Sequence, residues 1–182
     1  TVGAELAEKG MLAIGCALLA IMLYIWFRFE WQFSIAAILA LAHDVLTTIG
    51  LFALTSFEFN LATVAAILTI AGYSINDTVV VFDRVRENLR RYKSYEQPAI
   101  LNMSLNETLS RTVMTSVTTM LALLAIVLFG GAVLRDFALA MMWGVVIGTY
   151  SSIFVAVGML ASFDLNKNLD EDEDPGVMRE EG

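Results

Sequence analysis

Five long apolar stretches constrain the fold of this 182-residue chain more than any other feature. Allowing for tilt, each is long enough to cross a hydrocarbon layer of about 30 Å as an α-helix. The backbone amides have no water partner in lipid, so continuous apolar stretches of this length fold as helices. The stretches run over about residues 10–27, 33–57, 61–82, 108–129 and 137–163. The sequence therefore predicts an all-α polytopic membrane protein with five transmembrane helices.

The composition agrees with this class and excludes several others. Hydrophobic residues make up 58% of the chain and charged residues 16%, against roughly 45–50% and 25% in soluble domains. Most of the net charge of −8 comes from residues 164–182, where eight acidic residues meet two basic ones. We expect this segment to be a disordered acidic cytoplasmic tail. The rest of the chain is neither strongly acidic nor strongly basic, so no nucleic acid partner is expected. A single cysteine excludes an internal disulfide, and with a single histidine we expect no metal cofactor.

The basic residues predict the orientation in the membrane. Arg28 lies between the first two helices, and five more basic residues lie in the polar stretch 83–107: Arg84, Arg86, Arg90, Arg91 and Lys93. By the positive-inside rule this stretch is a cytoplasmic loop and the N-terminus faces outward. Within the loop, the Ser104 to Glu107 spacing is that of a capping box, which predicts the start of the fourth helix near Ser104.

Asp77 is the residue that most directly indicates a function. It stands in an apolar stretch, about 9 Å inside the cytoplasmic end of its helix. A carboxylate at membrane depth costs a few kcal/mol or more and usually faces a bundle interior or a wet cavity. Proton or ion handling, or pairing with a buried cation, is therefore the functional interpretation. The alternative is a carboxylate that only holds two helices together.

Arg111 lies at a matching depth in the fourth helix, where it could meet Asp77 across a helix interface. Alternatively, its long side chain could extend to the lipid headgroups. Arg111, Thr115 and Thr119 share one helix face, which indicates a hydrated path or ordinary hydroxyl bonds to the backbone and neighbouring helices. Further polar residues complete the candidate proton-transfer site around Asp77. Tyr73 and Ser74 are expected beside it, Asn76 next to it in sequence, and the His43-Asp44 pair nearby.

The His43-Asp44 pair falls near the middle of the second helix, far from either water phase. Asp44 is a candidate relay partner for the Asp77 site, with His43 beside it. The pair is equally well explained as an internal polar clamp between helices. With no second histidine and no H-E-x-x-H motif, a zinc site is not expected.

These residues carry a resemblance to a known family. Residues 60–88, with Gly72-Tyr73-Ser74-Ile75-Asn76-Asp77 at their centre, resemble the signature of the SecF family of bacterial protein-export membrane subunits. Three further motifs match the pattern of the family in order: Arg28-Phe29-Glu30-Trp31, Ala42-His43-Asp44-Val45 and Arg111-Thr112-Val113-Met114-Thr115-Ser116. The resemblance covers about residues 1–163.

The resemblance implies both an architecture and an activity. A complete SecF has six helices, with an extracytoplasmic domain after the first, so this chain would hold five helices of an RND-type six-helix half. SecF works with SecD beside the SecYEG translocon in the bacterial inner membrane, and uses the proton motive force to promote preprotein translocation. Carried over to this chain, the essential carboxylate is Asp77 and the intramembrane arginine is Arg111, while Asp44 belongs to a family motif.

Two other classes remain as alternatives. A proton-driven RND-type exporter of small molecules or lipids would share the proton site, but it needs a substrate path formed with an outer domain. An intramembrane enzyme needs a nucleophile or paired catalytic groups. Asp44 and Asp77 lie at different depths and no catalytic motif is present, so we do not expect an enzyme.

Overall fold

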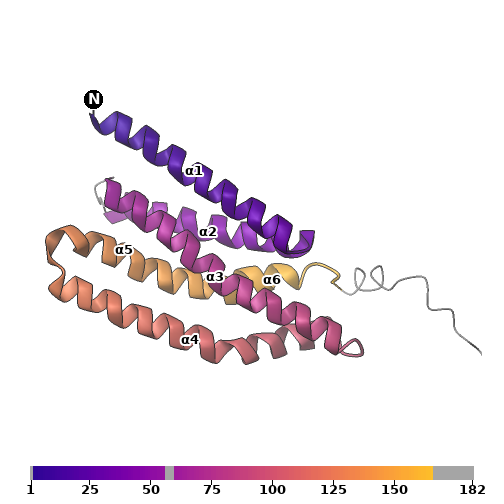
Figure 1. Ribbon diagram of the computed structural model, residues 1–182. Helices are drawn as coiled ribbons and strands as arrows, with labels where there is room; N and C mark the ends of the chain where they lie inside the picture. Colours follow the sequence, from indigo (N-terminus) through magenta and orange to yellow (C-terminus); the bar gives the residue numbers. More distant parts are fainter. Residues whose placement is uncertain (1, 56–59, 166–182) are drawn as a thin grey trace, which may run out of the picture.

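The computed structural model describes residues 2–55 and 60–165, apart from the side chains of residues 2–7, 132 and 133. Within these ranges the secondary structure is helical, with no strand (Figure 1). The elements are α1 (Val2–Arg28), α2 (Trp31–Thr55), α3 (Leu61–Arg91), α4 (Gln97–Phe129), α5 (Gly131–Tyr150), the π-helical segment η1 (Ser151–Ala156) and α6 (Val157–Leu160).

Five spans in the described residues are long and apolar enough to cross a membrane, judged by length and composition. The fifth of them, Leu134–Leu160, joins most of α5 with η1 and α6 in one continuous helical rod. The prediction of an all-α protein with five spanning helices is confirmed.

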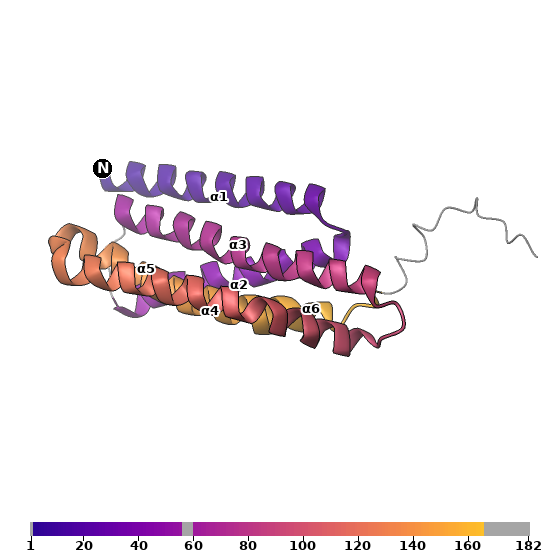
Figure 2. The same ribbon diagram turned by 60° about the horizontal axis from the view of Figure 1, so that its bottom comes forward.

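The central element of the bundle is α3. It packs against α1, α2, α4, α5 and η1. Both ribbon views place α1 on one side of α3 and α4 on the other (Figures 1 and 2). Side chains on different faces of α3 therefore meet different neighbours, and the polar residues of this helix range from buried, such as Ser74, to exposed, such as Asn76.

The polar stretch 83–107 is mostly helical, so the predicted long loop is wrong in its extent. α3 continues to Arg91 and α4 begins at Gln97, which leaves a short connection between them. Pro98 stands in the first turn of α4, where its missing N–H breaks no helical hydrogen bond.

Ser104 does not cap a helix: its hydroxyl is buried mid-helix and donates to the carbonyl of Ile100. A capping box is found instead at the start of α3. There the side chain of each of Asn60 and Thr63 accepts a hydrogen bond from the backbone N–H of the other.

The predicted acidic tail begins slightly too early. Leu165 is buried, and its N–H donates to Oε1 of Gln97 at 3.1 Å. Nε2 of Gln97 donates to the carbonyls of Leu160 and Phe163, so one α4 side chain holds the end of α6. The rest of the predicted tail, from residue 166, lies outside the described residues.

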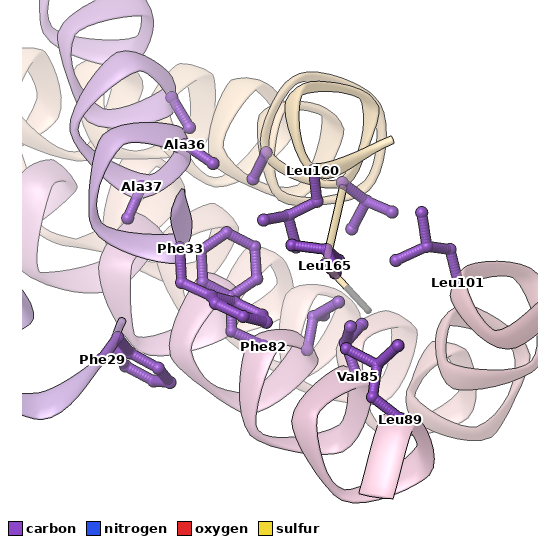
Figure 3. Packing of buried hydrophobic residues seen from close by; sticks show 14 of the residues in the cluster. Phe29, Phe33, Ala36, Ala37, Phe82, Val85, Leu89, Leu101, Leu160 and Leu165 are labelled. Atoms are coloured by element: carbon purple, nitrogen blue, oxygen red, sulfur yellow. The ribbon is translucent and has the colours of Figure 1, made fainter. Parts of the chain in front are cut away.

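An aromatic and aliphatic core closes the end of the bundle that carries Arg28. Figure 3 shows the rings of Phe29, Phe33 and Phe82 together, with aliphatic side chains from α3, α4 and α6 around them. The Phe33 and Phe82 rings meet edge to face, with centroids 5.4 Å apart. This arrangement adds to the burial energy of the rings, and it fixes the ends of α2 and α3 relative to each other.

Two glycines allow α5 to approach α3 closely. A Cβ added at Gly144 would lie 2.2 Å from Cγ1 of Ile70, and one added at Gly148 would lie 3.2 Å from Cβ of Ser74. Small residues spaced in this way are common where membrane helices pack tightly. The contact at Gly148 also sets the position of Ser74, whose hydroxyl is part of the polar interior described below.

We expect Gly144→Ala to lower the stability of the bundle by about 1–3 kcal/mol, because the new methyl group overlaps the Ile70 side chain. Thermal unfolding of the detergent-solubilised protein measures the effect. Gly72→Ala is the matched control. It also adds a methyl group to a helix, but nothing lies within 4 Å of the new atom, so stability should stay equal or rise. Equal melting temperatures for the two variants would contradict the close approach of α3 and α5.

Candidate functional site

Asp77 lies half-buried on the α4 side of α3. Its Oδ1 accepts a hydrogen bond from the Thr112 hydroxyl at 2.7 Å. Its Oδ2 is buried, and within the described residues no hydrogen bond to it is found. The expected intramembrane carboxylate is therefore present in the α3–α4 interface with only one of its two oxygens satisfied. Such an oxygen is an acceptor ready for a proton or a water molecule.

Arg111 and Asp77 are not joined directly. No ion pair between them is found in the part of the chain that the structure describes, where Thr112 provides the contact to Asp77 instead. The helical rotation of about 100° per residue explains this, since it turns Arg111 away when Thr112 faces α3. The Arg111 side chain is exposed and lines a pocket with Arg84 and Glu107.

Asp44 is the most completely enclosed acidic side chain of the described residues, with 0% exposure. Its Oδ2 accepts hydrogen bonds from the hydroxyls of Ser74 on α3 and of Ser151 on η1, the latter at 2.6 Å. Nδ1 of His43 lies 3.0 Å from its Oδ1, where a protonated Nδ1 donates. One α2 carboxylate thus binds α3 and η1 together, which is the geometry of a polar clamp.

Ser74 therefore contacts a different carboxylate from the one we expected. It precedes Asp77 by three residues, but its hydroxyl points to Asp44. The hydroxyl of Tyr73 lies 3.5 Å from that of Ser116, which in turn lies 2.7 Å from the hydroxyl of Thr149.

The remaining polar candidates contact the protein less. Asn76 is exposed, and Thr119 is half-buried. Thr115 is exposed, and its hydroxyl donates to the backbone carbonyls of Arg111 and Thr112. Thr115 therefore makes the hydrogen bond to the preceding helical turn that is common for threonines in membrane helices.

The sequence reasoning did not identify the two buried serines of η1. Ser151 binds Asp44, and the hydroxyl of Ser152 lies 3.0 Å from that of Thr78, one residue after Asp77. The Ser151-Ser152 pair inside an apolar stretch was the available signal. What the sequence did not indicate was the π-helical turn that brings both serines to the interior, a local widening often found at functional sites.

The described residues contain no group of three or more His, Cys, Asp or Glu side chains that could hold a metal ion. The polar groups of the interior are carboxylates, an imidazole and hydroxyls. Each of these groups can donate or accept a proton.

The fold and these groups define a class: a polytopic helical membrane protein that keeps two carboxylates inside its bundle, both in contact with hydroxyls of neighbouring helices. Residues 1–166 match the family described as "Protein export membrane protein SecD/SecF, C-terminal". The chain belongs to this family. Protein export, not catalysis, is the activity that the description of the family names.

Two relatives are "Protein translocase subunit SecF" of Rhodobacter capsulatus and of Rickettsia rickettsii. The first is 54% identical over 174 residues, covering 96% of this chain and 52% of the relative. The second is 51% identical over 162 residues, covering 89% and 53%. The chain thus spans about half the length of these relatives.

Solved structures support the same family at the level of the fold. The crystal structure of SecDF from Thermus thermophilus, described as a translocon-associated membrane protein, matches with a TM-score of 0.83 at 49% identity. The match covers 87% of this chain and 22% of that protein. SecDF in its super-membrane-facing form matches with a TM-score of 0.77, again at 49% identity, over 85% of this chain and 21% of that protein.

Proposed function

We propose that this chain is the membrane-embedded helical part of a SecF-like subunit. In this proposal it acts with SecD and uses the proton motive force to promote preprotein translocation through SecYEG. The family match and the SecF relatives support the export role over small-molecule or lipid export. The SecDF structures, whose name joins the two subunits, support SecD as the partner.

The single observation that carries the proton role is the half-satisfied carboxylate of Asp77. Its Oδ2 is buried without a hydrogen bond in the described structure, inside a helix that is long and apolar enough to span the membrane. A carboxylate in this position costs free energy of folding, and in membrane proteins such a group by default indicates a proton or ion path. Thr112 holds Oδ1 and leaves Oδ2 to receive the proton.

In this proposal Arg111, the neighbour of the Thr112 that contacts Asp77, acts on Asp77 electrostatically, and Asp44 acts as a clamp or relay. Asp44 accepts a hydrogen bond from Ser151 of η1, and the next residue, Ser152, contacts Thr78, the neighbour of Asp77 in α3. A rearrangement of η1 would therefore affect both carboxylates. Such coupling is what a proton-driven motor requires, because the charge state of one site must change the packing of the helices.

We further propose that the protein is a multi-pass protein of the bacterial inner membrane, with the α3–α4 connection on the cytoplasmic side. The basic residues near this connection support that orientation. Several of them form ion pairs there, with Arg28 on Asp83 at 2.8 Å and Arg86 on Glu30 at 3.4 Å. Membrane lipid then surrounds the exposed apolar faces of α1 and α4.

The experiment that tests the partner and the substrate is co-purification from membranes. We call the full-length protein that contains this chain the intact parent. Carrying an affinity tag, it should retain SecD after mild detergent extraction, together with a smaller amount of SecYEG. Preprotein translocation in vesicles should lose its stimulation by a proton gradient when the parent is removed, and recover it when the parent is restored. Recovery of an efflux adaptor in place of SecD, with unchanged translocation, would refute the proposal.

A further inference from the structure

The turn between α3 and α4 carries a cluster of exposed basic side chains. We call Arg90, Arg91 and Lys93 the basic tip; all three are exposed. Over residues 90–96 these three basic residues meet one acidic residue, Glu96, which gives the segment a net charge of +2. No ion pair of Arg90 is found among the described residues, and Nη2 of Arg91 lies 3.4 Å from Oε1 of Glu87 with the arginine side chain still 58% exposed. The basic tip therefore presents positive charge to an acidic segment within reach.

Basic residues nearer the apolar part of the bundle are paired with carboxylates of neighbouring helices. Nη2 of Arg28 on α1 lies 2.8 Å from Oδ1 of Asp83 on α3. Nε of Arg84 on α3 lies 2.6 Å from Oε2 of Glu107 on α4. These contacts balance the charge of both arginines inside the bundle, so the excess of positive charge at this end is concentrated at the basic tip.

The basic tip extends beyond the lipid headgroups. The apolar part of α3 ends near Phe82, and the helix continues to Arg91. At 1.5 Å per residue, with α3 close to the membrane normal, this places Arg91 roughly 13 Å outside the hydrocarbon layer. The headgroup layer is only about 5–8 Å thick on each side. Lipid phosphates therefore lie on the membrane side of the basic tip, which favours a protein segment as its counter-charge.

Leu165 places the start of an acidic segment beside the basic tip. Its N–H donates to Oε1 of Gln97 at 3.1 Å, and Gln97 begins α4 directly after the α3–α4 connection. Leu165 also belongs to the same core cluster as Leu89, the residue before Arg90 (Figure 3). Further along the sequence, residues 170–174 are five consecutive acidic residues. The five residues from Leu165 to the first of them span at most about 18 Å, so the acidic run starts close to the basic tip.

We propose that the acidic segment 170–174 docks on the basic tip by charge pairing and shields it from other anionic partners. A single exposed ion pair is weak, but here several pairs can form at once. The short connection to Leu165 also makes the association intramolecular, with an effective concentration in the millimolar range. The contact needs no packed core in the segment, in agreement with its composition. It is independent of the proton role of Asp77, so its failure would leave the proposed function intact.

Cross-linking between two introduced cysteines tests the contact. In the intact parent, with Cys16 and any other cysteine replaced by serine, Ser94→Cys marks the exposed connection and Gly176→Cys marks the end of the acidic segment. The protein is placed in nanodiscs that contain phosphatidylglycerol, so that anionic headgroups compete for the basic tip, and is treated with a short bismaleimide. The cross-link should form, and its rate should fall at least about fivefold from low to high salt, because salt screens exposed charges. A cross-link that forms only in uncharged lipid would show that headgroups occupy the basic tip, and would overturn the proposal.

Neutralising substitutions separate charge pairing from simple proximity. Arg90→Gln should slow the cross-linking about threefold, the size expected for the loss of one exposed ion pair, and the addition of Arg91→Gln should slow it further. Arg135→Gln is the matched control, because it removes one exposed positive charge at the opposite end of α4 and should leave the rate unchanged. Equal rates in Arg90→Gln and Arg135→Gln, or a rate that does not respond to salt, would overturn the docking of the acidic segment.

Discussion

Asp77→Asn should abolish the stimulation of preprotein translocation by a proton gradient. The carboxamide has nearly the shape of the carboxyl group and keeps an oxygen to accept the Thr112 hydroxyl, so α3 and α4 should stay packed. It cannot gain or lose a proton near neutral pH, so the transported proton loses its binding group. The measurement is late-stage translocation in membrane vesicles, with and without the gradient.

The control is the neighbouring substitution Asn76→Ala. Asn76 is exposed and adjacent in sequence, so this change tests whether any alteration of the segment is harmful. We expect near-normal stimulation in Asn76→Ala and normal SecD association in both variants. Full gradient-dependent stimulation in Asp77→Asn would show that this carboxylate only holds helices together.

Asp44→Ala should cause the largest loss of stability among single substitutions in the polar interior. It removes the acceptor of the buried Ser74 hydroxyl and leaves the Ser151 hydroxyl with only the Gly148 carbonyl, and a buried donor left without a partner costs about 1–3 kcal/mol. The clamp between α2, α3 and η1 then opens. The midpoint of thermal unfolding in detergent should drop, and export should fall with the amount of folded protein.

Two further variants separate the clamp from the charge itself. Asp44→Asn keeps a carbonyl oxygen as acceptor and should lose much less stability than Asp44→Ala. Asp83→Ala removes a carboxylate from the exposed ion pair with Arg28, a kind of contact worth at most about 1 kcal/mol. If Asp44→Ala were as stable as Asp83→Ala, the buried cluster would not be holding these helices.

The features that the sequence predicted well are those that depend on length and burial cost. The five apolar spans required helices, and Asp77 was expected to face protein because lipid does not tolerate a carboxylate. These properties belong to single segments and need no knowledge of the neighbouring helices.

The features that were missed depend on rotation and register between helices. Whether Arg111 or Thr112 faces Asp77 is decided by a turn of about 100° in α4, which the packing with α5 sets. Ser74 could have faced either carboxylate, and the contact at Gly148 places it near Asp44. The π-helical turn at Ser151 has no sequence signature that we could use. The polar stretch 83–107 resembled a loop because its helices extend beyond the apolar segments.

Proton flux through the purified protein tests whether Asp77 carries the transported proton. The intact parent is reconstituted together with SecD into liposomes that contain a pH-sensitive dye, and a pH gradient is imposed. We expect a proton flux above that of empty liposomes. Asp77→Asn should lose this flux and Asn76→Ala should keep it. An equal flux in Asp77→Asn and in the unaltered protein would contradict the claim that Asp77 carries the proton.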